Sequence, residues 1–208
     1  MRRMVAFTSF LFVLALVASP VMAGGECCKA AVKDGQGWCE KCKHGEVFGF
    51  HLATKKVYDA LAGVPISESG MEKSACCAKA IKESGSCSGC KVSFANGRMY
   101  RSDMAHDIVL GTPINDAKVA AVLAKCEGCT KASESTEGAW CDACGGGVVC
   151  GRWYTTKESF TAAQKAAKVV SRAIAAAKKC EGCGTAMVTD GTCAACKVSF
   201  KDGEMIKS

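Results

Sequence analysis

The amino-acid sequence predicts an α+β fold in which four small β-hairpin units follow one another in tandem, joined by α-helices and related by an internal duplication. The chain has 208 residues and 17 cysteines, and 16 of the cysteines fall into eight close pairs. The pairs recur as four two-pair units, and helical sequence patterns alternate with these units. The paired cysteines are Cys27 and Cys28 with Cys39 and Cys42; Cys76 and Cys77 with Cys87 and Cys90; Cys126 and Cys129 with Cys141 and Cys144; and Cys180 and Cys183 with Cys193 and Cys196.

The duplication is predicted from matching stretches in the two halves of the chain. Residues 37–42 (GWCEKC) match residues 139–144 (AWCDAC), and residues 90–94 (CKVSF) return at 196–200. Each copy of the CKVSF stretch is followed, one residue later, by Asn-Gly or Asp-Gly, which are turn dipeptides. Each half therefore holds two cysteine units separated by a helical spacer.

The fourth unit shows how a cysteine unit is expected to fold. Residues 184–188 are predicted to form a short strand, and Asp190-Gly191 then turns the chain toward Cys193. A second hairpin is expected from residues 197–200 and 204–206, around Asp202-Gly203. The two C-x-x-C turns would then face each other at one end of the hairpin.

The spacers between units have helical periodicity. Residues 157–178 repeat apolar side chains at three- and four-residue steps, and Thr155 with Glu158 is predicted to cap the start. Shorter helices are expected at 115–125 and at 55–62. No stretch promises a large core, so the units are expected to need cross-links of metal or disulfide. The predicted apolar face of the long helix consists of Phe160, Ala163, Ala167, Val170, Ile174 and Ala177.

Four thiols delivered by two C-x-x-C turns are the usual donors of a tetrahedral thiolate site for a metal ion, most often zinc. All sixteen paired cysteines are therefore predicted metal ligands, for up to four zinc ions or another soft metal. The pattern resembles zinc-ribbon and zinc-knuckle modules, and that resemblance implies a structural ion and a docking surface but no reaction. The chain also looks like exported bacterial cysteine-rich proteins built from such units, a likeness that implies no particular function.

Two features depart from this pattern. The first pair of the first two units consists of adjacent cysteines, and aligning Cys77 with Cys183 places Ser74 opposite Cys180. The fourth sulfur of these units must come from another direction, so these sites are expected to be distorted, three-coordinate or oxidised. Cys150 has no counterpart in the other units, which suggests dimerisation, reactivity or a spare ligand.

Three other chemistries remain open for the thiols. Structural disulfides suit an oxidising compartment, and capture of a soft ion such as Cu(I) or Hg(II) suits the thiol density. Thiol–disulfide exchange is disfavoured, because helices run into the cysteines and place a helix C-terminus nearest the sulfur, which raises the thiol pKa. No other catalytic motif is present, so the chain is predicted not to be an enzyme.

The ends and the charge of the chain indicate where it acts. Residues 1–23 resemble a secretory signal, so the mature chain is expected to be exported to the periplasm or the exterior, without a membrane segment. The formal net charge of +7 becomes negative once sixteen thiolates surround four divalent ions, so no nucleic-acid partner is predicted. An unidentified protein partner is expected. The predicted boundaries are 1–23 (signal), 24–54 (first unit), 55–75 (spacer), 76–103 (second unit), 104–125 (linking helix), 126–154 (third unit), 155–179 (long helix) and 180–208 (fourth unit).

Overall fold

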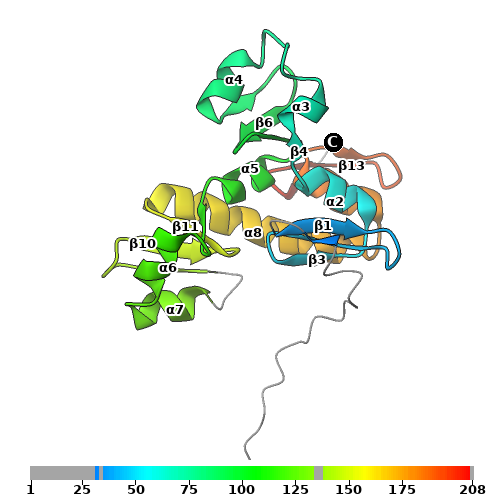
Figure 1. The fold of residues 1–208 in the computed structure, drawn as a ribbon. Coiled ribbons are helices and arrows are strands. Elements are labelled where there is room, and N and C mark those ends of the chain that lie inside the picture. The colour runs from blue at the N-terminus through cyan, green and yellow to red at the C-terminus, as the bar shows by residue number, and fades with distance from the viewer. Residues whose placement is uncertain (1–30, 33–34, 134–137, 207–208) are drawn as a thin grey trace, which may run out of the picture.

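The computed structural model describes residues 31–32, 35–133 and 138–206 of the chain. The predicted signal segment, Cys27 and Cys28 lie outside these residues. The described part is a mixed α/β fold with four small antiparallel sheets connected by helices. Helix α8 runs through the middle of the molecule, and the sheets lie around it (Figure 1). No helix in the described ranges is long and apolar enough to cross a membrane.

Each cysteine unit contains the same three-stranded antiparallel meander. The first strand leads into the C-x-x-C turn, the second strand follows, and a two-residue turn leads into the third. The strands, in unit order, are β1 (Gln36–Cys39), β2 (His44–Val47) and β3 (Phe50–Leu52); β5 (Ser86–Cys87), β6 (Val92–Ala95) and β7 (Arg98–Tyr100); β9 (Ala139–Cys141), β10 (Gly146–Val149) and β11 (Arg152–Tyr154); and β12 (Thr192–Cys193), β13 (Val198–Lys201) and β14 (Glu204–Ile206). The predicted hairpin around Asp202-Gly203 is confirmed, because β13 pairs with β14.

The turn between the second and third strands has one conformation in all four units. Its first residue is Phe48, Asn96, Cys150 or Asp202, with φ between 51° and 54°, and a glycine with φ between 67° and 78° follows. Two successive residues with positive φ make a type I′ turn, which matches the twist of a two-stranded hairpin. Cys150, which has no counterpart among the paired cysteines, therefore occupies a turn position shared by all four units.

The sheets of the second and third units each gain a fourth strand from the linker that precedes the unit. Strand β4 (Val64–Pro65) pairs with β7, and strand β8 (Thr112–Pro113) pairs with β11. The two added strands lie in matching segments, Gly-Val-Pro-Ile at 63–66 and Gly-Thr-Pro-Ile at 111–114. In each segment the isoleucine N–H donates to the glycine carbonyl of the type I′ turn, at 3.0 Å.

An arginine and a tyrosine on the third strand hold each added segment. Arg98 Nε donates to the Gly63 carbonyl at 3.1 Å, and Arg152 Nη1 donates to the Gly111 carbonyl at 2.8 Å. The ring of Tyr100 lies 2.6 Å from where a Cβ at Gly63 would be. The ring of Tyr154 lies 2.6 Å from where a Cβ at Gly111 would be. A glycine is therefore required at the start of both segments.

The predicted spacer helices are present. Helices α2 (Lys55–Leu61), α6 (Ala117–Leu123) and α8 (Lys157–Ala177) match the expected positions within two residues at each end. The cap of α8 lies one residue later than predicted: Thr156, not Thr155, accepts a hydrogen bond from the Ser159 N–H at 3.2 Å. Thr156 has the extended backbone that an N-cap requires. The other helices are α3 (Ile66–Ser69), α4 (Ala78–Glu83), α5 (Asp103–Val109), α7 (Glu127–Ser133) and α9 (Glu181–Val188).

The strand predicted at residues 184–188 is wrong, because these residues belong to helix α9. Helix α9 packs directly on α8, and Gly184 makes this close approach possible. A Cβ at Gly184 would lie 2.5 Å from the Ala177 Cβ and 2.7 Å from the Ala173 carbonyl oxygen. The packing partner, which the local sequence does not reveal, therefore decides the conformation here.

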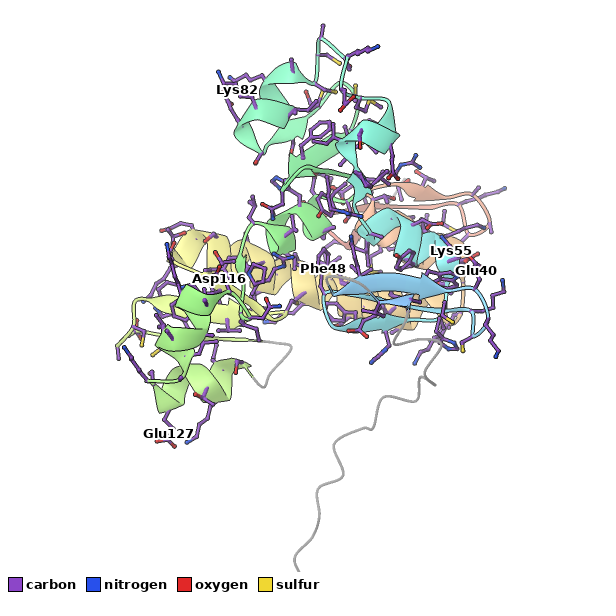
Figure 2. All side chains as sticks on the ribbon, in the orientation of Figure 1. Glu40, Phe48, Lys55, Lys82, Asp116 and Glu127 are labelled. Atoms are coloured by element: carbon purple, nitrogen blue, oxygen red, sulfur yellow. The ribbon has the colours of Figure 1, made fainter. Side chains whose placement is uncertain are left out.

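The expectation that no large core forms is also wrong. One cluster of buried residues joins side chains from all four units, including Val188 of α9, to the buried residues of α8. Alanine makes much of the buried surface of α8, which lets neighbouring elements approach closely. Figure 2 shows Phe48, from the turn of the first unit, in the middle of the molecule, where the Arg152 guanidinium lies 5.8 Å from its ring centre. The second, third and fourth units each add a much smaller cluster that includes their own cysteines.

A methyl group at Gly63 tests the role of the added strands. We expect Gly63→Ala to lower the free energy of unfolding by about 1–3 kcal/mol, because the new Cβ would overlap the Tyr100 ring. Urea denaturation followed by circular dichroism measures the change. Gly85→Ala is the matched control, since a Cβ there meets no atom within 4 Å. Equal effects of the two substitutions would contradict the packing role of Gly63.

Candidate metal centres

The second cysteine pair of each unit lies in a tight turn after the first strand. The residue that follows the pair has a left-handed backbone in every unit: φ is 55° at Lys43, 53° at Lys91, 63° at Gly145 and 53° at Lys197. This conformation turns the chain back into the second strand. In the second, third and fourth units, the two sulfurs of this pair converge with those of the first pair.

The first cysteine pair of the third and fourth units lies at the start of a helix. Helix α7 begins at Glu127, directly after Cys126, and Cys180 is the N-cap of α9. The expectation that a helix C-terminus lies nearest these sulfurs is therefore wrong. Helices α6 and α8 do run toward the pairs, but a new short helix begins at each pair, and its N–H groups point toward the first sulfur.

The structure brings together three quartets of cysteines that could each hold a metal ion. In each quartet the four sulfurs lie within 4.8 Å of one another. The quartets combine the two pairs of the second, third and fourth units, as the spacing predicts. They are Cys76, Cys77, Cys87 and Cys90; Cys126, Cys129, Cys141 and Cys144; and Cys180, Cys183, Cys193 and Cys196.

The sulfur–sulfur distances fit a tetrahedral ion. With metal–sulfur bonds of about 2.3 Å, the sulfurs of a tetrahedral site are about 3.8 Å apart. The structure has 3.7 Å from Cys126 to Cys141, and the Cys180 sulfur is 3.7 Å from both Cys193 and Cys196. A disulfide needs about 2.0 Å. The disulfide alternative gains no support from these quartets, since no two of their sulfurs lie at bonding distance.

The second unit completes its quartet despite its adjacent cysteines. The Cys76 sulfur lies 3.8 Å from Cys77 and 3.3 Å from Cys90. The expectation of a three-coordinate or oxidised site in this unit is not met: four sulfurs converge. The close sulfur–sulfur distances in this quartet range from 3.3 to 3.8 Å, which fits the remaining alternative, a distorted four-sulfur site.

Glycine explains how two different sequence patterns build the same quartet. In the alignment of the units, Cys76 corresponds to Gly128. A Cβ at Gly128 would point into the third quartet, 3.7 Å from the Cys141 sulfur and 3.8 Å from the Cys126 sulfur. A cysteine at this position can therefore supply the fourth sulfur directly. Ser74 then occupies the position of Cys126, and its hydroxyl lies 3.2 Å from the Cys76 sulfur.

Hydrogen bonds make one thiol of each quartet more acidic than usual. The backbone N–H of Cys129 lowers the pKa of Cys126 to about 7, and the N–H of Cys183 does the same for Cys180. The Ser74 hydroxyl is the largest cause of the lowered pKa of Cys76, also about 7. Metals bind thiolates, so a thiol half-ionised near neutral pH is a ready first ligand.

The predicted site of the first unit lies partly outside the described residues. Cys39 is buried and Cys42 is half-buried at the turn after β1, where the other units hold their second pair. Cys27 and Cys28 lie outside the described residues, so this fourth site stays a prediction. Cys150 lies in no quartet; it is buried in the central core, and burial raises the pKa of its thiol to about 12.

No protein-family model, curated protein or solved structure matches this chain.

Exchanging the position of one cysteine tests the geometry of the quartets. We expect Cys126→Ser to weaken metal binding by the third unit, because one of its four ligands is lost. Adding Gly128→Cys should restore it, since the double variant reproduces the Ser-x-Cys-Cys pattern of the second unit. Co(II) thiolate absorption, titrated per protein, reports the number of four-sulfur sites.

The control adds the same cysteine where no quartet can use it. Gly85→Cys in the Cys126→Ser background places a thiol where the new Cβ meets no atom within 4 Å. It should leave the third site as weak as in Cys126→Ser alone. If Gly128→Cys restores no more binding than Gly85→Cys, the proposed equivalence of Cys76 and Gly128 is wrong.

Proposed function

We propose that this protein is a non-enzymatic, metal-stabilised structural or interaction protein whose thiolate quartets hold zinc. The observation that supports it best is the convergence of four sulfurs in each described quartet, all within 4.8 Å of one another and with close pairs 3.3–3.8 Å apart. A zinc ion completes such a site without redox chemistry and links the two cysteine pairs of one unit. The exported location predicted from residues 1–23 and an unidentified protein partner belong to the same proposal.

The size of the local apolar clusters supports a stabilising role for the ions. In the fourth unit, the fully buried part of the cluster is limited to Ala186, Cys193 and Phe200. Together with Val188, which joins the central core, these side chains supply little apolar burial to offset the loss of chain entropy when the unit folds. A bound ion supplies the missing free energy, because it can bind the folded unit but not the unfolded one.

A second candidate function is the capture of soft metal ions. Cys76 and Cys196 are exposed at the edges of their quartets, so an incoming ion or a competing thiol can reach them. The third quartet has no exposed cysteine. Different exchange rates for the quartets would suit a protein that takes up ions according to supply.

The structure removes the earlier argument against thiol–disulfide exchange, because two C-x-x-C pairs do lie at helix starts. The sulfurs of each of these pairs nevertheless lie within 4.8 Å of the sulfurs of a second pair in the same unit. Four converging thiols offer a metal site, and a bound ion would occupy the nucleophilic sulfur. We therefore retain the non-enzymatic proposal.

Removing the ions should unfold the small units before the central core. With a zinc-specific chelator, we expect backbone amides of the fourth unit, such as that of Phe200, to lose protection from hydrogen exchange. Val169 and Val170 of α8 should remain protected, because their cluster contains none of the quartet cysteines. Hydrogen exchange measured by mass spectrometry, with and without chelator, follows both regions. Unchanged protection of the fourth unit after complete zinc removal would contradict the stabilising role.

Intact mass decides between bound metal and disulfides. Under native conditions, we expect at least three zinc ions per chain from the described quartets, and a fourth if Cys27 and Cys28 join Cys39 and Cys42. Acid should release all of them, because protonated thiols do not bind zinc. Disulfides would instead leave no metal and a deficit of about 2 Da for each bond formed.

A further inference from the structure

A cleft lies between the second and fourth units and borders the second quartet, because Cys87 is among the residues that line it. Its volume is about 390 Å³. Pockets of roughly 300–1,000 Å³ commonly hold small molecules. The second unit contributes its C-x-x-C turn and the residues after β7, and the fourth unit contributes the end of α9 and the end of β13. The polar and charged side chains around it are Ser86, Ser88, Lys91, Arg101, Asp103, Thr189, Asp190 and Lys201.

The two carboxylates of the cleft already have hydrogen-bond donors. The Ser93 hydroxyl donates to Asp103 at 2.6 Å. Asp190 accepts from the Lys201 ammonium at 2.5 Å and from the Asp202 backbone N–H at 2.7 Å. Asp190 therefore pairs with Lys201, whereas Asp103 is bonded to a neutral hydroxyl, forms no ion pair with Lys91 or Arg101, and keeps its negative charge at the cleft.

Lys91 and Arg101 are the cations that remain. Neither forms an ion pair with any carboxylate of the described residues. Both are exposed and line the same cleft, so their charges add at one place. Lys91 also has a positive φ, a conformation that glycine adopts more easily and that Gly145 supplies in the third unit. The turn itself therefore does not require a lysine at position 91.

We propose that this cleft binds a small molecule through an anionic group, a phosphate or a carboxylate, held by Lys91 and Arg101. Arg101 offers paired N–H donors that match either group, and Lys91 offers a compact charge at the same open end of the β6–β7 hairpin, where the start of β6 lies beside the end of β7. The volume fits a small molecule. Binding would join the second and fourth units through a ligand, in addition to any role of the metal ions.

A titration of the zinc-loaded full chain tests this. Inorganic phosphate and citrate are added in separate arms at constant ionic strength, and the backbone amides of Ser88, Lys91 and Thr189 are followed by NMR. We expect saturable shifts with at least one anion, and the two arms show whether phosphate or carboxylate is preferred. Loss of either cation should weaken binding about tenfold, the usual effect of removing one charge-assisted hydrogen bond. Absence of saturation in both arms would overturn the proposal.

Matched variants separate the cleft from general charge attraction. Lys91→Gln with Arg101→Gln should lower the affinity, whereas Lys165→Gln with Lys168→Gln on the exposed side of α8 should leave it within about twofold. Both pairs change the net charge equally. Asp103→Asn should raise the affinity several-fold, because it removes a negative charge while keeping the acceptor for Ser93, and damage to the fold cannot produce such a gain. Equal losses from the two pairs, or weaker binding by Asp103→Asn, would overturn the proposal.

Discussion

The convergence of four cysteine sulfurs is the constraint on which the small units depend. The second and fourth units each have three short strands and only a small apolar cluster of their own, which is little buried surface for independent folding. Backbone conformation fixes both cysteine pairs of each described quartet. A residue with a left-handed backbone follows the second pair, and a short helix starts at the first pair. These local conformations direct the four sulfurs of a quartet toward one point, as a metal site requires.

Helix α8 gives these units a common support. Its buried alanines allow the sheets, α5 and α9 to pack closely around it, so that the molecule has a central core in addition to its cysteine clusters. Stability is thus divided between two kinds of interaction. Apolar burial holds the centre of the molecule, whereas metal ligation is proposed to hold the outer parts.

Cysteine spacing and hydrophobic periodicity predicted much of this arrangement. The spacing gave the members of three quartets, and periodicity gave α2, α6 and α8, because both signals are local in sequence. The prediction of a strand at 184–188 failed because the helical conformation of this segment depends on the packing of Gly184 against α8. The local sequence does not show that contact. The strands β4 and β8 have two residues each and no periodicity, so only the repeated Gly-x-Pro-Ile segment could have revealed them. The position of Gly128 beside the sulfurs likewise needs three-dimensional geometry. The internal duplication itself stays a prediction.

The added strands β4 and β8 affect how the chain can be divided. Each one completes the sheet of the unit that follows it, and Arg98 or Arg152 binds the glycine at its start. A spacer is therefore also the outer edge of the next sheet. A fragment cut immediately before Cys76 would keep every sulfur of the second quartet and still expose the backbone of β7. Independent pieces of this protein would have to begin at Gly63 or Gly111, upstream of the first cysteine of the unit they contain.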